Sequence, residues 1–172
     1  KADPKDWGSV PDDYNWKWND ATCDFTANGY RLPTEAEWEW AARGGKSYKY
    51  AGSDDADEVA WYGYASSYTF GTRDVKTKKA NGYGLYDMSG NVYEWCWDGY
   101  SDISEDTPAT GPDANFCCCL RGGSWYFNAF NAQVAVRWYY DYESFLTTAY
   151  DRSNESYSRY YDYGFRLVRN AN

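Results

Sequence analysis

The chain has 172 residues, the length of one domain with its own hydrophobic core. Aromatic residues make up 22% of it and His is absent, so the composition argues against a disordered chain and excludes histidine-based catalysis and imidazole metal ligands. The net charge of -9 argues against nucleic-acid binding, and no apolar run is long enough to span a membrane. We therefore expect a single acidic, aromatic-rich domain over residues 1–172.

The clearest predicted helix covers residues 34–43. It begins with a capping-box pattern, in which the side chains of Thr34 and Glu37 each bind the backbone N–H of the other residue. Gly44 and Gly45 follow it, and glycine favours the left-handed backbone that ends many helices. The stripe that we expect to be buried consists of Trp38, Ala41 and Ala42.

The rest of the chain reads as short strands, turns and long loops. Alternating apolar residues and flanking turn residues predict short extended segments at residues 85–88, 92–95, 116–120, 133–138 and 164–168. The longest irregular stretches are 44–80, 97–115 and 139–163. One helix, several short strands and long ordered loops predict an α+β fold with little regular secondary structure.

Five cysteines occur, and none of them form a CxxC pair, so a zinc ribbon or a thioredoxin-like site has no support. Cys117, Cys118 and Cys119 are consecutive, and neighbouring residues about 3.8 Å apart do not reach the Cα separation of about 5.5 Å that a disulfide prefers. A bridge from Cys23 or Cys96 to this triplet stays open. Our expectation is buried thiols that pack as small hydrophobic residues.

Four segments, in this order, resemble motifs of the formylglycine-generating-enzyme (sulfatase-modifying-factor) domains. They are YRLPTEAEWEWAARGG at residues 30–45, NGYGLYDMSGNVYEW at 81–95, LRGGSW at 120–125 and GFRLV at 164–168. The resemblance implies the C-type lectin-like fold of that family. It also implies that a further N-terminal segment precedes the region matching Lys1 and pairs with the C-terminal strand. We therefore expect the chain to be part of a longer protein, with residues 164–168 lacking a neighbouring strand.

The resemblance also bears on catalysis. The oxidising members of the family bind copper through two cysteines that follow the Gly-Gly-Ser motif. Here the residues three and eight positions beyond Ser124 are Phe127 and Ala132, which cannot bind Cu(I), and the related iron enzymes need histidines that this chain lacks. We expect no enzymatic activity. The alternatives are an oxidase relative that has lost its catalytic cysteines and a purely structural module of a secreted protein.

Residues 121–168 resemble the variable region of proteins diversified by retroelements, which display randomised residues on this same fold. Of the 39 residues from Trp125 to Tyr163, 14 are aromatic, and Tyr mixed with Ser, Asn and Asp is typical of binding surfaces. These elements mutate template adenines, and Asn codons changed in this way never encode Lys, Met, Trp, Gln or Glu. Lys and Met are absent between Gly122 and Asn172, which agrees with that mechanism without deciding for it. The exceptions have to be fixed positions or come from other codons, and they are Trp125, Gln133, Trp138, Glu143 and Glu155.

We therefore expect a diversified surface that binds a macromolecular partner, most simply a protein, outside the cell or on its surface, with anchoring through an N-terminal part outside this chain. The residues expected to contact the partner are Tyr126, Phe127, Asn128, Phe130, Asn131, Trp138, Tyr139, Tyr140, Tyr142, Asp151, Ser153, Asn154 and Tyr160. The alternative is that all of 126–163 is packed loop. Tyrosines on consecutive positions at 139–140 and 160–161 argue against it, because neither a strand nor a helix buries both. The expected core residues nearby are Trp125, Val134, Val136, Phe165 and Leu167.

The resemblance further implies a calcium site in the segment 87–94. By position, the ligands are the side chains of Asp87 and Glu94 and the carbonyls of Gly90 and Val92, and such a mixture of oxygens suits Ca²⁺. The alternative gives Asp87 the role of capping a turn and places Glu94 in a buried polar network.

Overall fold

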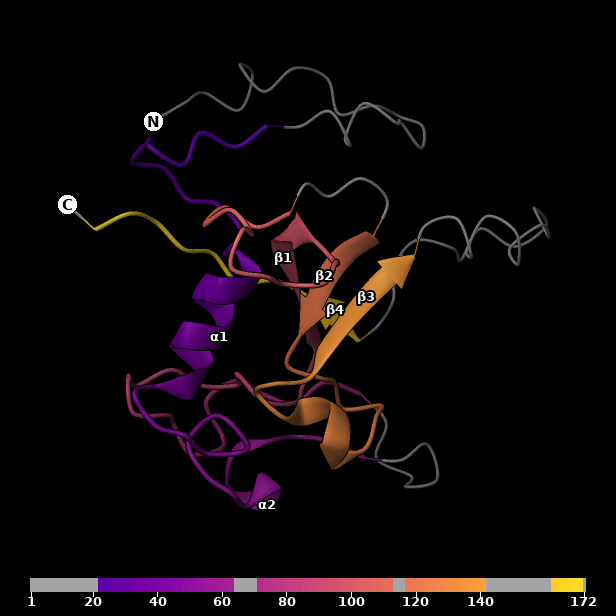
Figure 1. The fold of residues 1–172 in the computed structure, drawn as a ribbon. Coiled ribbons are helices and arrows are strands. Elements are labelled where there is room, and N and C mark those ends of the chain that lie inside the picture. The colour runs from indigo at the N-terminus through magenta and orange to yellow at the C-terminus, as the bar shows by residue number, and fades with distance from the viewer. Residues whose placement is uncertain (1–21, 64–70, 113–116, 142–161, 172) are drawn as a thin grey trace, which may run out of the picture.

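A computed structural model describes residues 22–63, 71–112, 117–141 and 162–171, and shows a four-stranded sheet with a helix against one face (Figure 1). In chain order the elements are α1 (Glu35–Arg43), α2 (Ala56–Val59), β1 (Tyr93–Gly99), β2 (Cys117–Arg121), the 3-10 helix η3 (Ala129–Ala132), β3 (Arg137–Asp141) and β4 (Tyr163–Gly164). The predicted α+β class with little regular secondary structure is confirmed. None of the helices in these described ranges has the length and apolarity to cross a membrane.

The strands lie in the order β3-β2-β1-β4. β2 runs antiparallel to both β1 and β3, and β4 runs parallel to β1. The register places Trp95 opposite Leu120 and Cys119 opposite Tyr139, with an irregularity between Trp95 and Gly99. The predicted strand at residues 133–138 is wrong in its first half, because residues 133–136 form a turn in which Val136 N–H donates to Gln133 O.

The predicted helix is confirmed as α1. Thr34 Oγ1 accepts from Glu37 N–H and Glu37 Oε2 accepts from Thr34 N–H, which completes the capping box. Gly44 ends the helix with φ 57°, and a Cβ there would lie 2.7 Å from the backbone N of Gly82. Asn81 then satisfies the last carbonyls, because its Nδ2 donates to Ala41 O and to Ala42 O.

The hydrophobic core lies between α1 and the sheet. Trp38 and Ala42 are buried as predicted, and Ala41 is half-buried. A second cluster joins α2 to η3, since Val59 and Ala60 pack with Ala132. The stretch 44–80, expected to be irregular, therefore contains a short helix that Asp55 caps by accepting from Asp57 N–H.

Two expectations for residues 164–168 are wrong. The segment has neighbours, because Gly164 pairs with β1 and Val168 exchanges two backbone hydrogen bonds with Arg31, of 2.9 and 3.0 Å. Phe165 and Leu167 are 65% and 53% exposed and so do not belong to the core. The reason is the alternation of an extended chain: Arg166 points inward to a buried carboxylate, so its two neighbours point outward. Val134 is buried as expected, whereas Trp125 and Val136 are half-buried.

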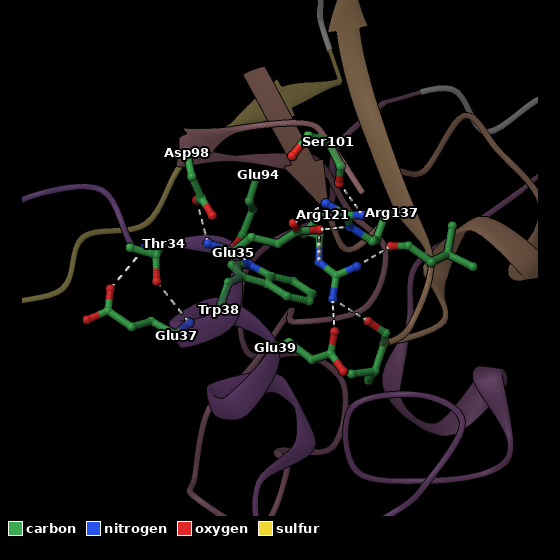
Figure 2. Close-up of polar contacts among 12 residues, drawn as sticks. Thr34, Glu35, Glu37, Trp38, Glu39, Glu94, Asp98, Ser101, Arg121 and Arg137 are labelled. Atoms are coloured by element: carbon green, nitrogen blue, oxygen red, sulfur yellow. Dashed lines mark hydrogen bonds and ion pairs between the residues drawn. The ribbon is translucent and has the colours of Figure 1, made fainter. Parts of the chain in front are cut away.

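A network of charged side chains links α1 to the sheet (Figure 2). Arg121 has no exposed side-chain surface; its guanidinium donates to Glu39 Oε2 at 2.5 Å, to Val134 O at 2.9 Å and to Val136 O at 2.8 Å. Arg137 holds both oxygens of Glu35 at 2.6 Å. Burial alone would raise the pKa of Glu35, but hydrogen bonds from Arg137 and Cys119 and the charge of Arg121 lower it overall, so the carboxylate is ionised.

The buried guanidinium of Arg121 should contribute more to the free energy of unfolding than an exposed ion pair does. We expect Arg121→Met to lower the free energy of unfolding by about 3–5 kcal/mol, because it leaves Glu39 Oε2 and two carbonyls without the donor that Arg121 supplies. The matched control is Lys79→Met, which breaks an exposed ion pair with Glu58 and should lower the free energy of unfolding far less. Urea denaturation measures both, and equal losses would contradict the role of Arg121.

The carboxyl of Asp98 gives a second test. It accepts from Glu35 N–H at 2.6 Å at the start of α1, and burial raises its pKa from 3.8 to about 6, although hydrogen bonds from the backbone of Glu35 and of Asp98 itself oppose the rise. Because the folded state holds this proton more tightly, the stabilisation is complete below about pH 3.8 and is lost as the pH rises through 6.

We therefore compare the free energy of unfolding of Asp98→Asn with that of the unsubstituted chain at each pH. Between pH 4 and pH 7 this difference should shift in favour of the variant by on the order of 1–3 kcal/mol. The reason is that the neutral amide does not lose a proton over that range. Denaturation curves across this range measure the difference. A difference that does not vary with pH would show that Asp98 titrates normally.

Candidate ligand-binding surface

The segment from Gly122 to Ser124 joins the sheet to the rest of the fold. Gly123 has φ 70°, and a Cβ on it would lie 2.7 Å from the backbone of Asn131, so only glycine fits without strain. Gly122 O accepts from Gly90 N–H at 2.7 Å, which ties this segment to the turn before β1. Backbone contacts with the turn before β1 and with η3 thus fix the position of the start of the region 121–168.

The other end of the same region is held by Asp162. Its Oδ2 accepts from Ser124 Oγ at 2.7 Å, both residues are buried, and its carbonyl accepts from Tyr93 N–H at 2.8 Å. Burial raises the pKa of Asp162, while the hydrogen bond from Ser124 lowers it in part. The described chain on either side of residues 142–161 is therefore held to the same sheet, by β3 on one side and by Asp162 on the other.

Aromatic rings cover the face of the sheet that points away from α1. Tyr93, which is 1% exposed, contacts Phe127 with ring centroids 5.6 Å apart and stacks on Trp138 at 6.4 Å. Phe127 also contacts Trp138 at 6.3 Å and Tyr126 at 5.4 Å. Tyr93 thus supports an outer layer of rings, of which Trp138 is 42% exposed.

Two further rings are exposed. Phe130 belongs to η3, and Tyr139, which is opposite Cys119 in the register, lies on the side of the sheet where α1 packs. Phe130 on η3 is 64% exposed, and Asn128 positions it by accepting from the N–H of Phe130 and from the side chain of Asn131. Tyr139 on β3 is 45% exposed and lies 4.8 Å from the ring of Tyr100. These rings are supported by neighbouring groups yet remain accessible, which is what a binding surface requires.

The structure separates the thirteen predicted contact residues into three groups. Those exposed to solvent are Asn128, Phe130, Trp138 and Tyr139. Those half-buried are Tyr126, Phe127 and Asn131. Those outside the described residues are Tyr142, Asp151, Ser153, Asn154 and Tyr160, together with the side chain of Tyr140. Their contact with a partner remains a prediction.

Sequence reasoning missed one residue beside Tyr139, namely Tyr100, which lies in the stretch 97–115 and is 37% exposed. Ile103 in the same stretch is 59% exposed. Arg137 holds the loop in place by donating to Ser101 O at 2.9 Å and by packing its guanidinium 4.6 Å from the Tyr100 ring. No local signal could have found this contact, because Tyr100 and Tyr139 meet only through the pairing of the strands.

The calcium ligands implied by the segment 87–94 do not fit a cation in this arrangement. Both oxygens of Glu94 are held by Arg166, at 2.5 and 2.6 Å, and Trp38 Nε1 donates to one of them at 2.7 Å. Asp87 Oδ2 accepts from Lys76 N–H, and its carbonyl accepts from Arg166. Over the part of the chain that the structure describes, no three Cys, Asp or Glu side chains are placed to hold a metal. The guanidinium of Arg166 already supplies the positive charge.

Comparisons with known proteins agree with this architecture. Residues 13–171 match the family described as the sulfatase-modifying factor enzyme 1-like domain. The chain belongs to this family. The resemblance drawn from the four sequence motifs is thereby confirmed.

Solved structures of this fold are similar over most of the chain. Treponema denticola variable protein 1 superposes with a TM-score of 0.74 and 41% identity, over 92% of this chain and 54% of that one. CarF superposes with a TM-score of 0.63 and 31% identity, over 87% of this chain and 50% of that one. The fold expected from the resemblance, including that to variable proteins, is confirmed.

Curated relatives include proteins of different names. The chaperone protein LppX of Paenibacillus barcinonensis is 39% identical over 139 residues, which is 70% of this chain and 47% of that protein. The formylglycine-generating enzyme of Streptomyces coelicolor is 39% identical over 125 residues, or 63% of this chain and 40% of that enzyme. The chain spans about half or less of the length of these relatives.

The Arg166–Glu94 pair leads to a prediction about metals. We expect the melting temperature to change by less than about 1 °C between buffer with EDTA and buffer with 5 mM CaCl₂, because Arg166 rather than a metal neutralises Glu94. Differential scanning fluorimetry measures it. A rise of several degrees with Ca²⁺ that Glu94→Gln abolishes would show instead that the carboxylate leaves Arg166 for the metal.

Proposed function

We propose that this chain is a non-enzymatic ligand-binding domain whose region 121–168 presents a diversified surface to a protein partner. The observation that carries the proposal is the exposure of Phe130, Trp138 and Tyr139 on elements whose positions the scaffold determines. A contiguous patch of exposed rings on a folded domain usually marks an interaction surface. The similarity to a variable protein supports the same function.

The arrangement suits binding with little loss of conformational freedom. Tyr and Trp have few rotatable bonds and combine apolar area with a polar group, so they serve as anchors in binding surfaces. Here the anchors already contact other rings, such as Tyr100 beside Tyr139 and Tyr93 beneath Trp138. Asn128 supplies a short polar group next to Phe130.

The residues at the two positions where the oxidising relatives have cysteines support a role without catalysis. The ring of Phe127 packs between Tyr93 and Tyr126, and Ala132 is 1% exposed. Neither side chain can bind Cu(I). Both instead contribute to packing, Phe127 beneath the exposed rings and Ala132 between η3 and α2.

A diversified surface is useful where targets change, so we propose display on the cell surface or outside the cell. Anchoring would belong to a part of the protein outside this chain. The recognised partner is a protein in this proposal because exposed aromatic rings and short amide side chains recognise polypeptide surfaces well.

Alanine substitutions test the proposal. We expect Phe130→Ala and Tyr139→Ala to change the melting temperature by less than about 2 °C, because both rings are largely exposed, and to weaken a partner about 30-fold each. Tyr93→Ala should lower the melting temperature by about 10 °C, since this ring is buried. The partner is to be captured by photo-cross-linking from position 139 and its affinity measured by calorimetry.

The matched binding control is Tyr30→Ala, because Tyr30 is also exposed but contacts Arg169, near the pairing of Arg31 with Val168. It should leave the affinity unchanged. Stability losses of several degrees in Phe130→Ala and Tyr139→Ala would favour packed loop over binding surface. A genomic repeat of codons 121–168 that differs only at adenines, beside a reverse transcriptase gene, is an independent check of diversification.

A further inference from the structure

Two cysteines meet across the centre of the sheet. β1 and β2 are antiparallel with Trp95 opposite Leu120, so Cys96 and Cys119 are the next residues on the two strands. They are 3% and 0% exposed and belong to the same core cluster as Trp38 and Met88. Both side chains therefore point to the face that α1 covers.

The two thiols are in contact. Cys119 is hydrogen-bonded to Cys96 and also to Glu35, and these contacts together with burial raise the pKa of the Cys119 thiol. The Cys119 thiol is therefore neutral in the folded chain, whereas attack on an oxidant needs a thiolate. A reaction between them has to occur while the chain folds, before α1 covers the sheet.

We propose that Cys96 and Cys119 form an intramolecular disulfide when the chain folds in an oxidising compartment. The proposal does not depend on what the domain binds. Neighbouring residues on antiparallel strands have Cα atoms about 4.5–5.5 Å apart, which lies within the range of about 4.4–6.8 Å seen for disulfides. The irregularity between Trp95 and Gly99 lets the two strands adjust to the bond.

The co-reactant is a small disulfide such as oxidised glutathione. The thiolate of one cysteine attacks it and releases one reduced glutathione, leaving a mixed disulfide on the protein. The second cysteine then attacks this sulfur and releases another reduced glutathione. The two protein sulfurs lose two electrons and two protons in total, which the two glutathione molecules gain. Glu35 keeps both of its hydrogen bonds from Arg137 after the Cys119 S–H is lost.

The bond would close the segment 97–118 into a loop. That loop carries Tyr100, whose ring lies beside Tyr139 of β3, and the exposed Ile103. Closing it removes conformational freedom from the unfolded chain, which stabilises the folded state. Cys118 follows the alternation of β2 and points to the other face, so it is the natural control.

The experiment is refolding of the chain from guanidinium chloride in glutathione buffer, followed by alkylation and mass spectrometry. We expect three alkylated cysteines out of five, and a linked pair of peptides after Asp-N digestion, which separates Cys96 from the triplet at Asp98 and Asp113. The melting temperature should exceed that of the reduced chain by about 5–10 °C, and a reducing agent during refolding should abolish the rise.

Cysteine-to-serine variants identify which two cysteines form the disulfide. Cys118→Ser should retain the linked peptides and the higher melting temperature, whereas Cys119→Ser should lose both. If Cys119→Ser fails to fold, Cys96→Ser tests the same bond from the other strand. Five alkylated cysteines after oxidative refolding, or linked peptides that persist in Cys119→Ser, would overturn the proposal.

Discussion

The guanidinium of Arg121 is completely buried and connects β2 to α1 and to the turn that precedes β3. It binds the carboxylate of Glu39 on α1 and two carbonyls of the turn that precedes β3, and it lies 5.2 Å from the ring of Trp38. A buried charge is costly unless it is paired with opposite charge and hydrogen-bonded, so the helix, the turn and β2 must take up this arrangement together. Figure 2 shows how Arg137 extends the same network to Glu35 and to the loop at Ser101.

This network explains how β3 can carry variable residues. The strand is held from the face that α1 covers, through Arg137 and through the hydrogen bonds of β2. The rings on its outer face, Trp138 among them, contribute much less to its position. Substitutions on that face therefore change what the surface can bind while the scaffold stays the same. A rigid framework with variable residues on its surface is the general solution for binding proteins.

Local features of the sequence were enough to predict α1. The capping box and the glycines after residue 43 act within a few residues of one another, so no tertiary information is needed. The segment 164–168 shows the opposite case, because an alternating pattern does not say which set of side chains points inward. Phe165 and Leu167 are the more apolar set, yet Arg166 points inward because Glu94, 72 residues away in sequence, is buried opposite it.

The surface follows the same division. Residues 121–168 could be identified from motifs that bracket an aromatic-rich segment, and four of the predicted contact residues are exposed. Only the structure shows that Tyr100 lies beside Tyr139, since a contact between β3 and the loop after β1 depends on strand order. Likewise, five cysteines in a sequence allow several pairings, and only the antiparallel register brings Cys96 next to Cys119.

The sequence by itself determined the family and the helix and indicated the region proposed to vary, because these depend on local patterns and on motifs in a particular order. The tertiary structure alone decided which rings face solvent, which cation neutralises Glu94 and which thiols meet. Those outcomes depend on groups that are distant along the chain and share one buried volume, where each charge or donor has to find its partner.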